Sequence, residues 1–432
     1  MSTSEKKLIE AIRPVKLGAK ISFKNSWEKD KLDINEVLWK SGGRVDKLPL
    51  NKEDSNEFLP EVKKTLESID NIFEKYGKKL TIPLVVYENI SVSEHLTRVE
   101  EDDKLYRENA TNLIKEEIFN SLNAELTWGS VKHYGIYKLS HNQTTKKGII
   151  KFKLTIPKGT RVLFTSDGSI ILPRNQSLKR SKPITRVKKQ YLKVETEIIS
   201  EASLEEEKKK DEVDVRKQIE QLIDLNTTTP VGRYFVNFNI DKTLGSVSLK
   251  NVPKIFKHLA DTFDPVVLKK VYDFMFSDVG GFVITDSNLM FTSHLVVKGL
   301  SLGEFAKYYL CEGISFPTGY MAFFLGSTRD KDRLLNVNGA MSHEMGHMLD
   351  YTLGIPSQSQ EFAELFNKEN QLFTAFGQKS PLEFWAEIVA AMYSEDLSRR
   401  EFVKNVVPRS YQFILNKIEE LKKNETTVNL IK

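Results

Sequence analysis

The segment that most constrains this chain is residues 341–350, which contain the pattern H-E-x-x-H. On an α-helix, residues four apart lie one turn apart on the same face, so His343 and His347 can direct two imidazole nitrogens at one metal ion. Neutral imidazoles suit Zn²⁺, at roughly 2.0–2.1 Å. Glu344 is placed to take a proton from water activated by the metal. The pattern predicts a metal-binding helix in which Gly346 leaves room beside the metal.

The alternative is an amphipathic helix that happens to carry two histidines. Three observations argue against it. The chain has only 7 His, and two of them have metal-ligand spacing with Glu344 between them. Met345, Met348 and Leu349 flank these polar groups, so the groups would be partly buried and would need partners. Candidates for a third ligand also follow downstream.

The third ligand is expected from a separate helix that begins near Ser380. Glu383 and Glu387 lie one turn apart in an otherwise apolar stretch. Ser380-x-x-Glu383 also has the form of a capping box, with Pro381 at the first helical position. If Glu383 only caps the helix, Glu387 is the ligand. If Glu383 binds the metal, Glu387 is placed to hold a ligand histidine by its second ring nitrogen.

This part of the chain resembles the zinc-peptidase domain of the anthrax lethal factor-like family, an H-E-x-x-H zincin. The resemblance covers residues 291–325, 343–350, 376–394 and 407–414. It implies one Zn²⁺ per chain, bound by His343, His347 and Glu383, the first glutamate of the E-F-W-A-E stretch. It also implies peptide-bond hydrolysis with Glu344 as the general base.

One family position is altered. The family carries a tyrosine seven residues before the third ligand, and its hydroxyl assists at the reacting carbonyl. Phe376 stands there and offers no hydrogen-bond donor. A second hypothesis is therefore a catalytically impaired zinc-binding toxin component or binding module. If the missing donor matters, we expect a slow peptidase rather than an inactive one.

The first half combines helices with short strands. Residues 57–76 have helical periodicity, 149–156 alternate as a strand does, and shorter strands are expected up to residue 199. Residues 56–90 and 149–199 resemble the ADP-ribosyltransferase fold of bacterial binary toxins.

Active transferases of that type carry an arginine on the first strand and a Glu-x-Glu motif. Glu88 replaces the arginine, and Asp167 and Ser169 occupy the Glu-x-Glu positions. A carboxylate at Glu88 would repel the phosphates of a dinucleotide. We therefore expect a degenerate, inactive domain, and ADP-ribosyltransferase activity is the third and least favoured hypothesis.

These observations predict an α+β chain of two domains. Residues 1–200 form the degenerate ADP-ribosyltransferase-like domain, 201–221 a charged linker helix, and 222–432 a mainly helical zincin metalloprotease domain. An apolar strand over 320–325 precedes the metal helix. It is either an ordinary core strand or the edge strand that pairs with an extended substrate. In the second case Tyr320, Ala322, Phe324 and Gly326 would contact the peptide.

Composition limits the other classes of function. The 432 residues suit two or three domains, and 40% hydrophobic with 28% charged residues is typical of soluble globular proteins. No apolar run approaches the roughly 20 residues of a membrane span. A net charge of +5 predicts no nucleic-acid role. The first residues contain no apolar signal core, so we expect a toxin or effector that is secreted or delivered without a recognisable signal peptide, or otherwise a cytoplasmic protein. The expected partner is a protein or peptide substrate, and the delivery partner stays open.

Overall fold

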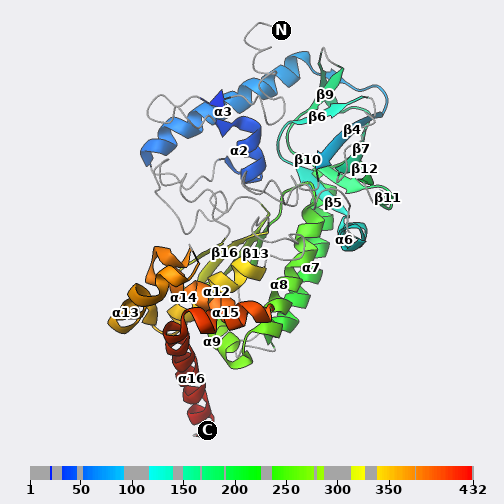
Figure 1. Cartoon of the computed structure of the whole chain (residues 1–432). Helices are drawn as coiled ribbons and strands as arrows, with labels where there is room; N and C mark the ends of the chain where they lie inside the picture. The colour runs from blue at the N-terminus through cyan, green and yellow to red at the C-terminus, as the bar shows by residue number, and fades with distance from the viewer. Residues whose placement is uncertain are drawn as a thin grey trace.

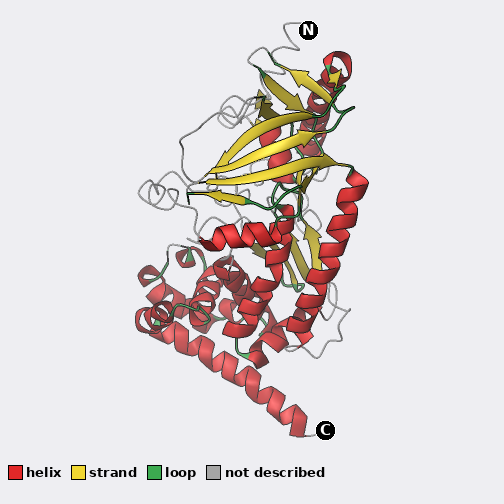
Figure 2. Cartoon of the chain, turned by 90° about the vertical axis from the view of Figure 1, so that its right-hand side faces the viewer, coloured by secondary structure: helices red, strands yellow, loops and turns green. Residues whose placement is uncertain are grey.

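A computed structural model shows a large sheet in the first half of the chain and a mainly helical second half (Figure 1). Figure 2 shows most of the strands in the upper part of the view and most of the helices below them. The structure describes residues 20–21, 32–45, 52–91, 116–139, 149–165, 168–188, 191–224, 236–276, 280–286, 313–325, 338–374 and 376–430. The predicted fold class, α+β, is confirmed.

The first half consists mainly of strands of one sheet. Its described elements are β1 (Lys20–Ile21), β2 (Leu32–Asp33), α2 (Ile34–Ser41), α3 (Lys52–Tyr76), β3 (Lys78–Lys79), β4 (Leu84–Ser91), α6 (Glu116–Glu125), β5 (Trp128–Val131), β6 (Gly135–Lys138), β7 (Ile149–Ile156), β8 (Arg161–Phe164), β9 (Ser169–Leu172), β10 (Gln176–Arg180), β11 (Thr185–Val187) and β12 (Tyr191–Ile199). The 10-stranded sheet has the order β3-β8-β9-β6-β4-β7-β12-β10-β5, and β11 pairs with β12. β7 and β12 are parallel, whereas β4 is antiparallel to β7.

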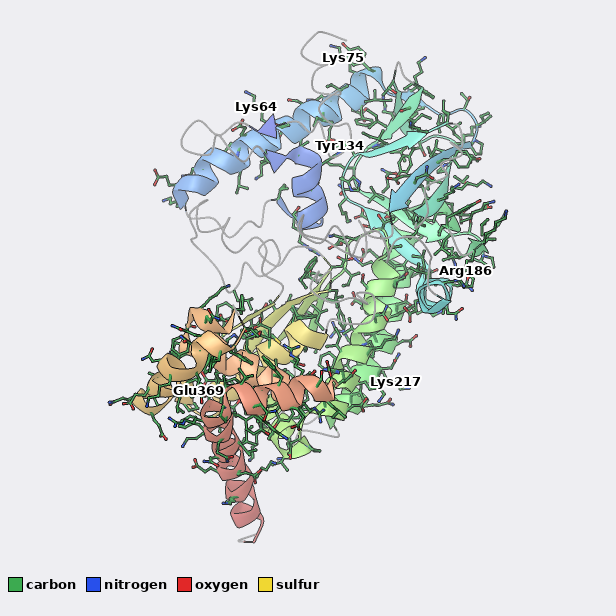
Figure 3. The ribbon with its side chains drawn as sticks, viewed as in Figure 1. Lys64, Lys75, Tyr134, Arg186, Lys217 and Glu369 are labelled. Carbon is green, nitrogen blue, oxygen red and sulfur yellow. The ribbon has the colours of Figure 1, made fainter. Side chains whose placement is uncertain are left out.

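Helix α3 packs one apolar face toward the sheet. Its buried positions recur at three- and four-residue steps: Val62, Leu66, Ile69, Ile72 and Phe73. Phe73 stacks on Tyr134 with ring centroids 5.8 Å apart, and the Tyr134 hydroxyl donates to Asp70 (Tyr134 is labelled in Figure 3). Arg174 pairs with the same carboxylate at 2.9 Å. These contacts hold the end of the helix against the loops of the sheet.

Helix α7 (Glu201–Asp224) follows β12 and runs toward the second half (Figure 1). Its charge run is largely exposed, but four side chains lie in the core of the second half: Leu204, Val215, Ile219 and Ile223. The segment expected as a linker is therefore a helix with one buried face, which packs along α8 (Gly245–Thr262). The domain limits at 200 and 221 stay a prediction.

Strand β5 brings the two halves into direct contact. The Trp128 indole donates to Asp211 of α7 at 2.8 Å, and the Ser246 hydroxyl donates to the Trp128 carbonyl at 2.9 Å. A Cβ atom on Gly129 would lie 2.0 Å from the carbonyl oxygen of Thr243, so only glycine permits this approach. The sheet of the first half is thus anchored to the segment that starts α8.

The second half surrounds a smaller sheet with helices. Besides α8, its described elements are β13 (Val236–Asn239), α9 (Pro265–Phe276), β14 (Gly281–Thr285), β15 (Gly313–Ser315), β16 (Tyr320–Phe324), α12 (Asn338–Thr352), η2 (Pro356–Gln358), α13 (Gln360–Glu369), η3 (Asn370–Leu372), η4 (Gly377–Lys379), α14 (Pro381–Met392), α15 (Leu397–Val406) and α16 (Pro408–Leu430). The sheet order is β13-β14-β16-β15. β13, β14 and β16 are parallel, and β15 is antiparallel to β16.

The C-terminal helix α16 is held at its first turn. Glu369, labelled in Figure 3, accepts hydrogen bonds from the backbone N–H groups of Arg409 at 3.1 Å and Ser410 at 2.9 Å. A carboxylate at a helix N-terminus satisfies free N–H groups and complements the helix dipole. In the described residues, no helix combines the length and the apolar character that a membrane span needs.

Candidate metal centre

The H-E-x-x-H segment lies on α12, where residues 341–350 are all buried. Met345, Met348 and Leu349 belong to the apolar core of the second half. His343 and His347 keep only 9% and 6% of their surface exposed and face α14. Two imidazoles are therefore held inside the protein, where they need polar partners.

Gly346 lets α14 approach α12 closely. A Cβ atom on this glycine would lie 2.8 Å from the Ala386 Cα atom and 2.9 Å from the Ala386 carbonyl oxygen. The Trp385 indole N–H donates to the Gly346 carbonyl at 3.2 Å and fixes the pair of helices. The expectation that Gly346 leaves room beside the metal is wrong, because the space is filled by the backbone of α14.

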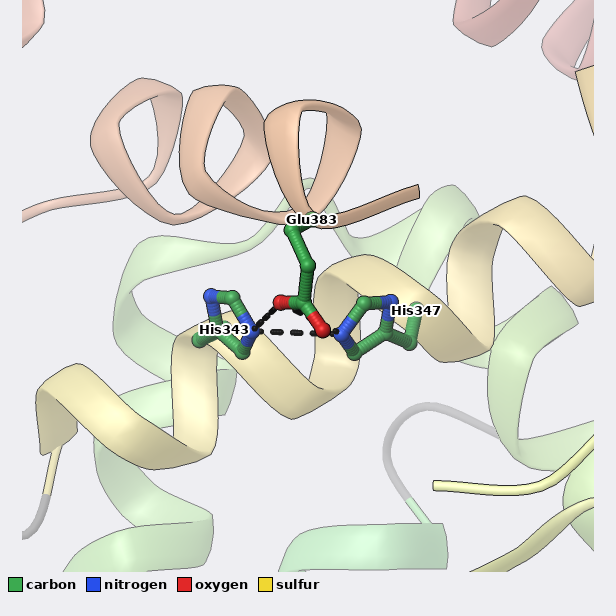
Figure 4. Close-up of side chains that lie close together, drawn as sticks. All are labelled: His343, His347 and Glu383. Atoms are coloured by element: carbon green, nitrogen blue, oxygen red, sulfur yellow. Dashed lines mark hydrogen bonds and ion pairs between the residues drawn. The ribbon is translucent and has the colours of Figure 1, made fainter. Parts of the chain in front are cut away.

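The start of α14 directs Glu383 toward the histidines. The Ser380 hydroxyl accepts a hydrogen bond from the Glu383 N–H at 3.2 Å, and so caps the helix. The Glu383 carboxylate oxygen Oε2 lies 3.0 Å from His343 Nε2 and 3.6 Å from His347 Nε2 (Figure 4). In a full capping box, the Glu383 carboxylate would bond back to the backbone N–H of Ser380. Here the carboxylate contacts the imidazoles instead.

The three donor atoms have the separations that a tetrahedral metal ion requires. The His343 and His347 Nε2 atoms are 3.1 Å apart, and the Glu383 carboxylate oxygen lies 3.0 and 3.6 Å from them. These three atoms are called the donor triangle below. Ligands at roughly 2.0–2.1 Å from a tetrahedral ion lie about 3.3 Å from one another. Two imidazole nitrogens this close can share only one proton, whereas a cation between them satisfies both lone pairs. The donor set therefore fits a divalent ion of this size.

A second carboxylate orients the first histidine. Glu387 lies 2.9 Å from His343 Nδ1, and the Thr374 hydroxyl donates to the other Glu387 oxygen at 2.9 Å. A proton on Nδ1 that faces Glu387 leaves the Nε2 lone pair of His343 directed at the donor triangle. The structure thus brings Glu383 and Glu387 to the two different nitrogens of one imidazole.

Without a metal, the cluster is an ion pair. Burial disfavours a charged His343, but hydrogen bonds with Glu383 and Glu387 outweigh it and raise the pKa of the imidazole to about 10. Burial also disfavours ionised Glu383, but hydrogen bonds with the two histidines lower the pKa of its carboxyl to about 2. A proton on His343 Nε2 occupies the place of the metal in this state, so proton and metal compete for the site.

Glu344 contacts the strand β15. The Ser315 hydroxyl donates to the Glu344 carboxylate. A Cβ atom on Gly313 would lie 2.4 Å from Glu344 Cγ, so glycine is needed for this contact. The short strand therefore positions the carboxylate that follows the first histidine.

The strand predicted to bind substrate is not at the edge of the sheet. β16, which carries Tyr320, Ala322 and Phe324, pairs with β14 on one side and β15 on the other. Sequence order alone suggested this strand because it precedes the metal helix, but the hairpin places β15 outermost in the described sheet. Gly326 lies outside the described residues.

Phe376 lies beside the histidines. Its ring centroid is 5.3 Å from that of His343, with the rings tilted by 74°. The Lys379 ammonium nitrogen lies 3.6 Å from the Phe376 ring centroid. The altered family position is thus adjacent to the donor triangle, and it presents a ring without a hydroxyl.

Two of the three positions compared with the transferase motifs, Glu88 and Ser169, lie in the large sheet. Glu88 is a partly buried residue of β4, and burial raises the pKa of its carboxyl to about 7. Ser169 closes a turn with Thr165, whose hydroxyl accepts from the Ser169 N–H at 3.0 Å. Asp167 lies outside the described residues. No arginine takes the place of Glu88 on this strand.

Sequence reasoning missed three residues around the histidines: Ser315, Tyr351 and Thr374. Ser315 and Thr374 hold carboxylates of the site, and Tyr351 stacks on His347 with centroids 6.4 Å apart. Tyr351 stands four residues after His347, so helical spacing could have identified it. Nothing local could have identified the other two, because a strand and a turn bring them to the site.

Two family models match this chain. The model described as "Anthrax toxin lethal factor, middle domain" matches residues 5–199, and the model described as "Anthrax toxin lethal factor, N- and C-terminal domain" matches residues 322–417. The second match includes the H-E-x-x-H helix and α14. The chain thus has a large α+β part followed by a helical part that holds the donor set. Both family models describe domains of lethal factor, and they define the class of protein to which the chain is compared.

The chain is a lethal factor-like protein, as the resemblance in its sequence predicted. It is 22% identical to lethal factor of Bacillus anthracis over 399 residues, which cover 90% of this chain and 48% of that protein. The chain therefore spans about half the length of the curated relative it matches.

Solved ADP-ribosyltransferases are also among the matches. C3larvin toxin from Paenibacillus larvae is 19% identical, with coverage of 46% of this chain and 89% of that chain and a TM-score of 0.31. The C3 exoenzyme of Clostridium limosum is 13% identical, with coverage of 46% of this chain and 86% of that chain and a TM-score of 0.31.

Substitution of Gly346 tests the contact between α12 and α14. Gly346→Ala should push α14 away from the histidines, lower the free energy of unfolding by about 1–3 kcal/mol and weaken metal binding. Metal titration and thermal unfolding would measure both effects. Met348→Leu, a volume-conserving change in the core of the same helix, is the control. Equal metal affinity in Gly346→Ala and the unmodified protein would contradict this account.

The raised pKa of Glu88 predicts a pH-dependent cost to folding. In the unfolded chain the carboxyl ionises near 4.5, but in the folded protein it ionises near 7. The cost is absent below pH 4.5, grows between pH 4.5 and 7, and is constant above pH 7, where it reaches up to about 3 kcal/mol. Glu88→Gln should therefore stabilise the protein at pH 8 but not at pH 4.5. Urea unfolding at both pH values measures this, and a pH-independent difference would refute it.

Proposed function

We propose that this chain is a zinc-dependent endopeptidase that acts in a toxin or a delivered effector. One observation carries the proposal: His343, His347 and Glu383 place three donor atoms 3.0–3.6 Å apart on two helices fixed by direct backbone contact. The match of residues 322–417 to the lethal factor model supports it. One Zn²⁺ per chain is the expected cofactor, because two imidazoles and a carboxylate with an open fourth position are typical of catalytic zinc.

The reaction assigns a separate task to each side chain. Zn²⁺ at this site would polarise the scissile carbonyl and make a water molecule more acidic. Glu344 accepts the proton of the attacking water and passes it to the leaving amine as the C–N bond breaks. The Ser315 hydroxyl holds the Oε2 atom of Glu344, and the Oε1 atom would take the proton. Glu387 keeps the Nε2 atom of His343 directed at the metal.

The peptide substrate would pair with β15. The Phe316 N–H donates to the Tyr320 carbonyl at 2.9 Å, which makes these two a hydrogen-bonded pair of the hairpin. Hydrogen-bonded and non-hydrogen-bonded pairs alternate in antiparallel strands, so the backbone groups of Gly313 and Ser315 face away from β16. In the part of the chain that the structure describes, no further strand pairs with β15. An extended peptide would bond to these groups beside Glu344 and would replace the long Tyr351 contact at the Ser315 carbonyl.

Two other functions remain testable alternatives. Phe376 supports a zinc-binding component that hydrolyses nothing, because it lacks a hydroxyl beside the site. An ADP-ribosyltransferase is disfavoured by Glu88. Incubation of the zinc-loaded protein with an unfolded protein distinguishes the three. Hydrolysis that stops on chelation supports the peptidase, zinc without hydrolysis supports the binding component, and modification that needs NAD supports the transferase.

Removal of one ligand should release the metal. His343→Ala and Glu383→Ala should lose most of the zinc at equilibrium, because two ligands remain. Glu387→Ala should bind zinc about 10–100-fold more weakly, since it removes only the hydrogen bond to His343. Glu361→Ala on the exposed face of α13 is the control. Zinc per chain, measured by atomic emission after dialysis, decides. Full occupancy in Glu383→Ala with loss in Glu387→Ala would reverse the assignment.

Removal of the base should stop hydrolysis but retain the metal. Glu344→Gln keeps the shape of the side chain and its contact with Ser315 but cannot accept the proton. We expect the rate of peptide cleavage to fall about 10²–10⁴-fold at unchanged zinc content. Cleavage of a peptide library, followed by mass spectrometry, provides the rate. Undiminished cleavage by Glu344→Gln would place the chemistry at another site.

A further inference from the structure

Peptide hydrolysis at this site needs a donor for the carbonyl oxygen. That oxygen gains negative charge as water attacks, and a fixed hydrogen-bond donor beside it lowers the barrier. Phe376, the aromatic ring next to His343, cannot donate. The donor must therefore be another side chain near the donor triangle that carries a protonated group.

Tyr351 is such a side chain. It lies on α12 one turn after His347, on the same face, and its ring stacks on the His347 ring at 6.4 Å and 19°. Its hydroxyl lies 3.5 Å from the Ser315 carbonyl oxygen, at the end of β15. Tyr351 therefore spans the space between the second histidine and the strand that faces Glu344.

The Tyr351 phenol carries a proton that it can donate. An unperturbed tyrosine ionises at about pH 10, so its hydroxyl keeps this proton at neutral pH.

We propose that Tyr351 donates a hydrogen bond to the scissile carbonyl oxygen as that oxygen becomes negative. The inference rests on the proposed peptidase function. Among the described residues, the hydroxyl has one hydrogen-bond contact, a long one of 3.5 Å to the Ser315 carbonyl. A hydrogen bond of that length is weak, so its exchange for a charged oxygen costs little. The stacking on the His347 ring restrains the Tyr351 ring during the exchange.

Lys379 is the competing candidate. Its ammonium group lies over the Phe376 ring at 3.6 Å and could also stabilise negative charge. The residue is exposed, however, and its flexible side chain must be ordered for each reaction. Tyr351 extends from a buried helix and has far fewer rotatable bonds, so it is better fixed in advance.

Tyr351→Phe tests the proposal because it removes only the hydroxyl. We expect kcat for peptide cleavage to fall about 10–10³-fold, with KM and zinc content little changed. Tyr411→Phe on α16 is the matched control and should keep the full rate. Phe376→Tyr, added to Tyr351→Phe, should recover part of the rate by supplying a hydroxyl next to His343. An unchanged kcat in Tyr351→Phe, or an equal loss in Lys379→Met alone, would overturn the assignment.

A binding measurement tests it without turnover. A phosphinic peptide carries a tetrahedral, negatively charged group in place of the scissile amide. Its affinity for the zinc-loaded protein should fall in Tyr351→Phe by about the same factor as kcat. The affinity of an ordinary peptide for the Glu344→Gln variant should not change when Tyr351→Phe is added. Equal losses for both ligands would show a role in general binding and refute the proposal. If the unmodified protein cleaves no peptide, the peptidase proposal fails, whereas the phosphinic peptide still tests Tyr351.

Discussion

Backbone contact between α12 and α14 at Gly346 sets the geometry of the site. The missing side chain lets Ala386 of α14 lie against the helix that carries the histidines, and the Trp385 indole bonds to the carbonyl of that same glycine. At this distance the carboxylates of Glu383 and Glu387 reach opposite nitrogens of His343. Buried ionisable groups are costly unless they pair with one another, and here the two histidines pair with the two glutamates. His347 Nδ1 has no hydrogen-bond partner among the described residues.

The sheet fixes the other side of the site. β15 contacts Glu344 through Ser315 and Gly313, and the hairpin that leads to β16 turns at Gly319, whose φ of +79° suits glycine. The candidate ligands thus come from helices, and a strand holds the candidate base. Behind α12, His258 of α8 lies 3.3 Å from the Ser342 hydroxyl and links the metal helix to the helix that contacts the first half.

The sequence predicts this site well where spacing along one helix defines it. His343 and His347 follow from the four-residue repeat, and the apolar residues around them predict burial. The sequence predicts less of the site where segments far apart in the chain meet. The capping pattern at Ser380 does not decide whether Glu383 or Glu387 is the third ligand, because it does not show which face of α14 meets α12. The edge position of β15 could not be predicted, since it depends on a hairpin that reverses the chain before β16.

Gly346 shows the same limit for a single residue. A glycine beside two metal ligands suggests space for the metal, but its role is to admit a neighbouring backbone that is 40 residues away at Ala386. Helix α7 shows the same limit for a whole element. The charge run after β12 is typical of a solvated linker, yet α7 buries Ile219 and Ile223 in the core of the second half.

Anomalous diffraction at the zinc absorption edge, from crystals of the zinc-loaded protein, tests the central claim most directly. The account predicts one strong peak per chain, at about 2.0–2.1 Å from His343 Nε2, His347 Nε2 and one Glu383 oxygen. Glu387 should remain bonded to His343 Nδ1 and should not touch the metal. The absence of a peak between α12 and α14, or a peak ligated by Glu387 in place of Glu383, would contradict it.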